Sequence, residues 1–299
     1  MTGVATTVGA ALRAAEKRFE AAEIEAPRTQ SVALLGHVLG HDRAAVLARL
    51  ADALDEQALD AFRAVVERRL QREPLQYILG RAHFLDFSLR VGPRVFIPRP
   101  ETEQLVAATL AAWDPADPVA VDVCCGSGAV AIALARARPE ARIVAIDRSP
   151  FACAATRRNA AELGVSDSIQ VVRGDLLACL PHPSTRVGVV VCNPPYAADG
   201  EVSQPEVLDH EPQDAIVSGP EGTEVYRRII PQAATLLAPG RSLLLELGFG
   251  REAAVRDLFR THGWENPVVE DDFQGIPRVL AARTRRADPT ASVPVESVP

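Results

Sequence analysis

After Pro118, short apolar runs alternate with helical segments over most of the remaining chain. The predicted strands cover residues 119–123, 142–146, 169–172, 187–192 and 242–247, and the predicted helices cover residues 127–138, 150–163, 224–237 and 251–262. Strands that alternate with helices in this way pair in parallel and bury both faces. The pattern therefore predicts an α/β fold, with a doubly wound, mostly parallel sheet and helices on both of its sides.

The first part of the chain is helical in pattern and shows no convincing strand. Residues 10–22 and 29–39 have helical character, and a third segment begins after Asp55, a good N-cap residue. In that segment apolar side chains recur every three or four residues, as on one face of a helix: Leu59, Phe62, Val66 and Leu70. We expect a small helical domain over residues 1–73.

The segment between these two parts has the two-residue period of a β-strand. Apolar side chains occupy every second position at Leu85, Phe87, Leu89 and Val91. Gly92 and Pro93 follow, and then a second short run at residues 95–97. This predicts a β-hairpin that turns at the Gly-Pro pair, inside a linker over residues 74–98.

The strand-and-helix domain is expected over residues 99–284, because Pro100 opens a helix ahead of the first strand. Residues 285–299 are rich in proline, serine and valine and have no periodicity. That composition predicts a disordered tail.

The charge balance argues against a nucleic-acid binder. Asp and Glu number 39 against 32 Lys and Arg, which gives a formal net charge of -7, and the chain has no run of five basic residues. Nucleic-acid binding normally needs a concentrated basic surface. The apolar runs are shorter than a membrane span, and the N-terminus lacks the pattern of a signal peptide. We therefore expect a cytoplasmic protein that binds neither membrane nor nucleic acid directly.

The five cysteines are expected to be reduced, structural thiols. Their number is odd, and Cys124 and Cys125 are adjacent, which disfavours both a disulfide and a tetrahedral zinc site. Asp209, His210 and Glu211 are also clustered, but charged residues gathered in a loop are more often solvated than bound to a metal. The sequence therefore predicts no metal site.

A glycine-containing loop follows the first strand of the α/β part, with the sequence Asp122-Val123-Cys124-Cys125-Gly126-Ser127-Gly128. It lies where a strand ends and a helix begins, which is the crevice where open α/β sheets bind ligands. Gly126 and Gly128 let the backbone approach a ligand, and the helix N-terminus suits a carboxylate or phosphate.

Acidic residues close the next two strands. Asp147 comes about 20 residues after the glycine loop, as does the acid that hydrogen-bonds a ribose in nucleoside-binding folds. Asp175 and Leu176 end the following strand, where an adenine edge would lie. NAD and S-adenosylmethionine both contain adenosine, so both fit this pattern.

The fourth strand runs directly into Asn193-Pro194-Pro195-Tyr196, which favours methyl transfer. An amide nitrogen is a poor nucleophile because its lone pair is delocalised, so an enzyme must hold it with hydrogen-bond acceptors. The Asn193 side-chain oxygen and the Pro194 carbonyl can accept its two N–H groups. The prolines hold these acceptors in place, and Tyr196 can stack on the flat group and exclude water. This predicts an S-adenosylmethionine-dependent methyltransferase that acts on a planar amide or amino nitrogen.

The sequence resembles a known family, the protein-(glutamine-N5) methyltransferases that modify the glutamine of the Gly-Gly-Gln loop in peptide chain release factors. The most specific shared segment is Ile97-Pro98-Arg99-Pro100-Glu101-Thr102-Glu103. The other segments are Arg72 to Gly80, the glycine loop, Asn193 to Tyr196, Glu211-Pro212 and Gly275 to Arg278.

The resemblance implies a class I S-adenosylmethionine-dependent methyltransferase with a Rossmann-like, seven-stranded sheet whose last strand is antiparallel. It also implies an N-terminal helical domain that helps to recognise the release factor. The expected cofactor-binding residues are Cys124, Cys125, Gly126, Ser127, Gly128, Asp147, Asp175, Leu176 and Asn193. Asn193, Pro194, Pro195 and Tyr196 are expected to bind the substrate glutamine, with Asn193, Pro194 and Tyr196 as the catalytic residues.

The chain departs from the family pattern at two places. Family members commonly carry Gly-Thr where this chain has Cys124-Cys125, and residue 197 is usually a larger aliphatic residue than Ala197. One alternative is a methyltransferase of the same chemistry that acts on another protein, a small-molecule amide or a nucleic-acid base. Another is a non-catalytic protein that binds a cofactor or a partner.

Overall fold

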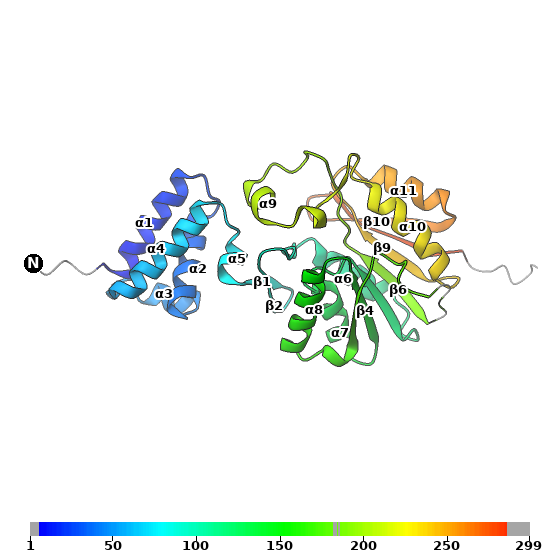
Figure 1. Ribbon diagram of the computed structural model, residues 1–299, viewed down its shortest axis with the longest axis horizontal. Helices are drawn as coiled ribbons and strands as arrows, with labels where there is room; N and C mark the ends of the chain where they lie inside the picture. Colours follow the sequence, from blue (N-terminus) through cyan, green and yellow to red (C-terminus); the bar gives the residue numbers. More distant parts are fainter. Residues whose placement is uncertain (1–5, 182–183, 185, 286–299) are drawn as a thin grey trace, which may run out of the picture. The chain divides into compact units, whose positions relative to one another are not determined.

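The computed structural model describes residues 6–181, 184 and 186–285. In it, the strands of the α/β part form one seven-stranded sheet (Figure 1). The strand order is β10-β11-β9-β6-β3-β4-β5. The strands are β3 (Val119–Val123), β4 (Arg142–Asp147), β5 (Ile169–Arg173), β6 (Val187–Cys192), β9 (Ser242–Glu246), β10 (Trp264–Asp271) and β11 (Pro277–Thr284). β5, β4, β3, β6 and β9 pair in parallel, whereas β11 is antiparallel to both β9 and β10. The predicted mostly parallel α/β fold is confirmed, and so is its antiparallel last strand.

Helices cover both faces of this sheet (Figure 1). One core layer contains residues of α6 (Thr102–Ala112), α7 (Ala129–Ala137) and α8 (Pro150–Glu162), and the other contains residues of α10 (Glu224–Leu236) and α11 (Glu252–Thr261). Side chains along each strand alternate between the layers because a strand has a period of two. In β6, for example, Val189 and Val191 lie in the first layer, and Val190 and Cys192 lie in the second.

The chain forms two compact units, and the smaller one is mainly helical. Of the described residues, it contains 6–82 together with Val91–Arg94 and Ser203–Glu211. Its helices are α1 (Val8–Ala21), α2 (Pro27–Leu39), α3 (Arg43–Ala48), α4 (Glu56–Leu70), α5 (Leu75–Leu79) and α9 (Pro205–His210). The larger unit contains the described residues of His83–Arg90, Val95–Val202 and 212–285. The domain limits given above stay a prediction, because compactness alone does not show which parts fold independently.

Local sequence explains where the helices of the smaller unit begin. The Asp55 carboxylate accepts a hydrogen bond from the Ala58 amide at 2.7 Å, as its predicted N-cap role requires. Asp42 caps α3 in the same way through the Ala45 amide. Apolar faces of these helices then pack into one core, which includes Phe19, Leu34, Leu35, Phe62 and Val66.

Helix α9 follows the Asn193–Tyr196 segment by nine residues in sequence, yet it packs in the helical unit. Arg69, only 5% exposed, donates to the Glu206 carboxylate at 2.9 Å and to the Gln30 side chain at 2.7 Å. Arg72 donates to the same Glu206 oxygen at 3.2 Å. Two arginines of the α4 end therefore hold α9 through one carboxylate.

The predicted hairpin exists, but its strands and turn differ from the expectation. The strands are β1 (Arg81–Phe84) and β2 (Phe87–Arg90), so the turn lies at Leu85–Asp86 and not at Gly92–Pro93. Leu85 has a φ of 50°, which a turn allows and a strand does not, and its side chain is 37% exposed. Residues 95–97 form no strand, although Val95 and Ile97 are buried.

The remaining described elements are short. They are the strands β7 (Ala197–Ala198) and β8 (Val217–Gly219), which pair in parallel, and the 3₁₀ helices η1 (Ser166–Ser168) and η2 (Gln213–Ala215). Within the described ranges, each helix is too short or too polar to cross a membrane. The five cysteines are free thiols. Of the predicted disordered tail, only residue 285 lies within the described residues.

Candidate active site

The predicted site residues Cys124, Asp147 and Asn193 meet at the carboxyl ends of neighbouring strands, together with Glu246 at the end of β9. Val123 at the end of β3 is in register with Ile146 on one side and with Cys192 on the other, and Cys192 is in register with Leu245. The residue that follows each of these paired positions therefore lies at the carboxyl-terminal ends of the parallel strands. In spatial order these residues are Asp147, Cys124, Asn193 and Glu246.

The glycine loop turns sharply between β3 and α7. Cys124, Gly126 and Gly128 have φ values of 60°, 55° and 87°, which lie in the left-handed region that favours glycine. A Cβ atom on Gly128 would lie 3.0 Å from the Thr156 side chain and 3.2 Å from its Cα, so this tight contact adds to the positive φ in favouring glycine. A Cβ atom on Gly126 would have no neighbour closer than 4.0 Å, which leaves its backbone open to a ligand.

Asp147 is tied to the glycine loop. One carboxylate oxygen accepts the Gly126 amide at 3.0 Å, and the other accepts the Ser149 amide at 2.8 Å. Burial raises the pKa of Asp147, and the two amide hydrogen bonds oppose that shift. Each oxygen keeps a second lone pair that can accept a ribose hydroxyl, as the sequence predicts.

Asp122 supports the same loop from inside the sheet. Its side chain is 1% exposed and accepts the Ala131 amide in the first turn of α7 at 3.0 Å. Burial raises the pKa of Asp122 to about 8, with a smaller contribution from the nearby charge of Asp147.

The predicted loop residue Cys125 is also buried, and its thiol lies 3.4 Å from the Thr156 hydroxyl. Ser127, 3% exposed, presents its carbonyl to the Asn159 amide at 2.8 Å.

The two predicted residues after β5 have different surroundings. Asp175 is exposed and forms an ion pair with Arg228 of α10. Leu176 has a φ of 51° and packs its side chain into the core layer of α10 and α11. A ligand at the carboxyl end of β5 could therefore contact only the backbone of Leu176 and the solvent-facing side of Asp175.

The Asn193–Tyr196 tetrad is held on several sides. The Asn193 side-chain nitrogen donates to the Thr102 hydroxyl at 3.0 Å, and Pro194 and Pro195 are buried. The Tyr196 amide donates to the Ile216 carbonyl at 3.2 Å. Gly248 lies against the Tyr196 ring, because a Cβ atom there would come within 2.7 Å of a ring carbon.

Thr102 and Glu246 extend the hydrogen bonds of the tetrad. The sequence predicted no role for either residue. The Thr102 hydroxyl donates to Glu246 at 2.7 Å, and the Tyr196 hydroxyl lies 3.5 Å from the other Glu246 oxygen. Burial raises the pKa of Glu246 to about 7, while the Thr102 hydrogen bond opposes this. Burial also raises the pKa of Tyr196. Two features of the sequence could have indicated these residues. Glu246 is an acid at the end of an otherwise apolar strand, and Thr102 lies in the most specific family segment.

The residue just before that family segment, Phe96, lies beside the cofactor loop. Its Cβ atom is one of two atoms that lie 4.0 Å from a Cβ built on Gly126, and the Arg99 guanidinium lies 4.8 Å from the centre of the Phe96 ring. The glycine loop, Asp147 and the tetrad thus lie at the carboxyl ends of the strands, close to the Phe96 ring and the open backbone of Gly126. This donor and acceptor set fits an adenosine-containing sulfonium cofactor next to an amide-binding group.

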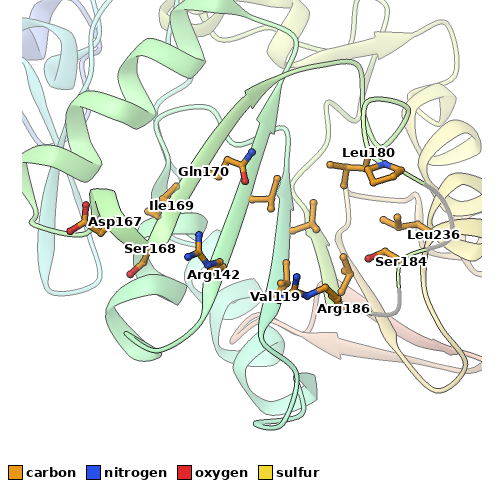
Figure 2. Close-up of a pocket in the computed structure, with 14 residues that line it drawn as sticks. Val119, Arg142, Asp167, Ser168, Ile169, Gln170, Leu180, Ser184, Arg186 and Leu236 are labelled. Atoms are coloured by element: carbon orange, nitrogen blue, oxygen red, sulfur yellow. The ribbon is translucent and has the colours of Figure 1, made fainter.

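A cavity of about 480 Å³ lies toward the amino-terminal ends of the parallel strands (Figure 2). Its lining includes the first residues of four strands, Val119, Arg142, Ile169 and Val187. None of the predicted site residues lines it, so it is separate from the site described above. No group of three or more His, Cys, Asp or Glu side chains suited to a metal occurs among residues 6–181, 184 and 186–285.

Comparison with protein families gives two matches along the chain. Residues 10–80 match the PrmC N-terminal domain, and residues 102–211 match the methyltransferase small domain. The chain is 39% identical to the release factor glutamine methyltransferase of Mycolicibacterium smegmatis over 93% of this chain and 98% of that protein. It is 37% identical to the protein of the same name from Moorella thermoacetica, over 93% and 99%.

Solved structures agree with the fold. The hMettl16 catalytic domain in complex with MAT2A 3'UTR hairpin 6 superimposes with a TM-score of 0.52 and 16% identity, over 69% of this chain and 78% of that one. At this identity the likeness concerns the arrangement of strands and helices alone.

Proposed function

Because the chain belongs to the release factor glutamine methyltransferase family, we propose that it methylates the side-chain amide nitrogen (N5) of the glutamine in the Gly-Gly-Gln loop of a peptide chain release factor. The methyl donor is S-adenosyl-L-methionine. Membership in this family agrees with the resemblance found in the sequence, and it sets aside the alternative of a non-catalytic binding protein.

The observation that carries the proposal is the orientation of the Asn193 amide. Its nitrogen donates to Thr102, so its oxygen points the other way and is the end offered to a substrate. That oxygen accepts one N–H of the glutamine amide, and the Pro194 carbonyl accepts the other. Holding both N–H groups fixes the plane of the amide, so the nitrogen lone pair, which is perpendicular to that plane, is directed toward the methyl group.

The bound cofactor supplies a methyl group made electrophilic by a positively charged sulfur. The glutamine nitrogen would form the new bond to the methyl carbon while the carbon–sulfur bond breaks, and one of the protons held by the Asn193 oxygen and the Pro194 carbonyl would pass to bulk water as the product leaves. Tyr196 covers the flat amide and excludes water. No strong base is needed beforehand, because the nitrogen becomes acidic only as it is methylated.

Cofactor binding is assigned to the glycine loop and its neighbours. The open backbone of Gly126 and the N-terminus of α7 receive the amino acid part, and Asp147 receives the ribose hydroxyls. Leu176 and Asp175 lie where the adenine would bind. Cys124 takes the place of a glycine and must present its backbone with a positive φ.

The helical unit is proposed to recognise the release factor. The net charge of -7 and the mixed charges of that unit disfavour direct nucleic-acid binding, and the substrate is a component of translation. We therefore expect the enzyme to act in the cytoplasm on a protein.

The test uses labelled S-adenosyl-L-methionine and a purified release factor, with the label located by peptide mass spectrometry. We expect label on the Gly-Gly-Gln peptide with the wild type and none with Asn193→Ala. Gln170→Ala, at an exposed position of β5, is the control and should label like the wild type. Label on another protein, a small amide or a nucleic acid, with none on the release factor, would reject the proposed substrate.

A further inference from the structure

Three side chains from three separate elements form one hydrogen-bonded chain behind the tetrad. The Asn193 amide nitrogen donates to the Thr102 hydroxyl at 3.0 Å, and that hydroxyl donates to Glu246 at 2.7 Å. Thr102 is 3% exposed and Glu246 is 1% exposed, so bulk water does not compete for either bond.

The chemistry of the threonine hydroxyl fixes the direction of this chain. A hydroxyl has one proton, and an ionised carboxylate only accepts, so the Thr102 proton points at Glu246. The Thr102 oxygen can then only accept from Asn193, which must present its NH₂ end. The reverse amide orientation would place an oxygen against an oxygen at Thr102, and it would place an NH₂ donor against the N–H groups of a substrate amide.

We propose that Thr102 and Glu246 are positioning residues that hold the Asn193 amide with its oxygen toward the substrate and thereby restrict the site to side chains with an N–H donor. The proposal rests on the function proposed above, and it adds a basis for selecting glutamine. A glutamate side chain has the same length as glutamine, but its carboxylate has no N–H to donate to the Asn193 oxygen.

Protonation of Glu246 would remove this control. A protonated Glu246 can donate to the Thr102 oxygen, and the Thr102 proton can then turn to Asn193. The groups that face Glu246 are Thr102 and Glu101 at the start of α6, Tyr196 of the tetrad, Tyr226 of α10 and Arg278 of β11. Tyr226 donates to the Glu246 backbone carbonyl at 2.7 Å and leaves its carboxylate to the others. Since the pKa of Glu246 is about 7, the rate should fall as the pH decreases below that value.

The kinetic test compares Thr102→Val, which removes the hydroxyl at nearly constant shape, with Thr102→Ser, which keeps it. We expect Thr102→Val to lower kcat for release factor methylation by about tenfold or more, with the dissociation constant of S-adenosyl-L-methionine changed less than twofold. Thr102→Ser should recover most of that loss. Thr109→Val is the matched control, because this buried threonine of the same helix bonds only to the Leu105 carbonyl.

The pH profile supplies a readout that a purely structural role would not move. The decline of kcat below about pH 7 should be present in the wild type and in Thr109→Val, and it should disappear in Glu246→Gln. Equal losses in the Ser and Val variants, a wild-type rate in Thr102→Val, or an acid limb that persists in Glu246→Gln would each overturn the proposal.

A second measurement does not depend on the substrate. The Asn193 side-chain NH₂ resonances, assigned by their absence in Asn193→Ala, should shift in ¹H–¹⁵N spectra with the titration of Glu246 and lose that response in Thr102→Val. If the wild type fails to methylate a release factor while this response is present, the proposed function fails and the orientation of Asn193 stands. If methylation is normal and the response is absent, the orientation proposal alone fails.

Discussion

The Asp147 carboxylate accepts a hydrogen bond from the Gly126 backbone amide at 3.0 Å, and this bond joins the end of β4 to the loop after β3. The residue proposed to bind the ribose therefore also shapes the loop proposed to bind the rest of the cofactor. Two functions predicted separately from the sequence depend on one side chain.

Asp147→Asn should weaken S-adenosyl-L-methionine binding by about 10- to 100-fold, measured by calorimetry. An asparagine has one acceptor oxygen in place of two, so it cannot accept from both Gly126 and Ser149, and each lost bond of this kind costs about 1–3 kcal/mol. Asp86→Asn, on the exposed hairpin turn, is the control and should bind like the wild type. Unchanged affinity in Asp147→Asn would argue against the assigned role.

Cys124→Gly should leave cofactor affinity intact and change the free energy of unfolding by no more than about 1 kcal/mol. The φ of 60° at Cys124 costs a side-chain residue about 1 kcal/mol, which glycine avoids, while glycine loses more chain entropy on folding. Cys124→Val should instead be destabilised by about 2 kcal/mol, because a β-branched side chain is strained there. Denaturant unfolding compares the two, and equal stabilities would show that the strain is absent.

Gly248→Ala should reduce kcat for methyl transfer by about 100-fold while cofactor binding is kept. The new methyl group would lie within 2.7 Å of the Tyr196 ring, so the ring must move away from the position in which it covers the amide. Gly92→Ala, where a Cβ meets nothing within 4 Å, is the control. A wild-type kcat in Gly248→Ala would show that Tyr196 need not be held in place.

Glu246→Gln should gain stability relative to the wild type as the pH rises. The pKa of Glu246 is raised from 4.5 to about 7 in the folded state, so between these values the folded protein holds a proton that the unfolded chain has lost. Wild-type stability therefore falls as the pH rises through this window, by roughly 3 kcal/mol in total, and the loss is complete above about pH 7. Denaturant unfolding at pH 5 to 8 should show this growing difference. Thr109→Val should keep a constant offset from the wild type.

Glu206→Gln should loosen helix α9 from the helical unit. The change leaves the buried Arg69 guanidinium without its carboxylate partner, which costs about 2 kcal/mol or more. Faster cleavage of the Ser203–Glu211 segment in limited proteolysis would report the effect. The double variant Arg69→Met with Glu206→Leu should recover protection, and equal cleavage of all three proteins would show that the ion pair does not hold α9.

The sequence predicted the five parallel strands of the sheet, and it did not assign β10 and β11. The pattern of β10 is mixed, because every second residue from Glu265 to Val269 is only half-buried and the residues between them are exposed. The run from Val187 to Cys192 is fully buried, as its uninterrupted apolar composition indicates. The hairpin failed because Leu85 continues the two-residue period into a turn, where its positive φ ends the strand. Periodicity reports which positions are apolar, and it does not report where the backbone reverses.

Local rules correctly placed Asp55 at a helix N-cap and Asp147 at the end of a strand, while ribose binding by Asp147 stays a prediction. The attachment of α9 was not predicted, because Arg69 and Glu206 are 137 residues apart and a salt bridge between them leaves no local pattern.

The sequence by itself determined the α/β fold and the chemistry of the tetrad, since both depend on residues that are close together in the chain. The tertiary structure alone decided which way the Asn193 amide points. Thr102 lies 91 residues before Asn193, and Glu246 lies 144 residues after Thr102. They meet only because α6 packs beside the carboxyl ends of β6 and β9, whose register places Glu246 next to Asn193.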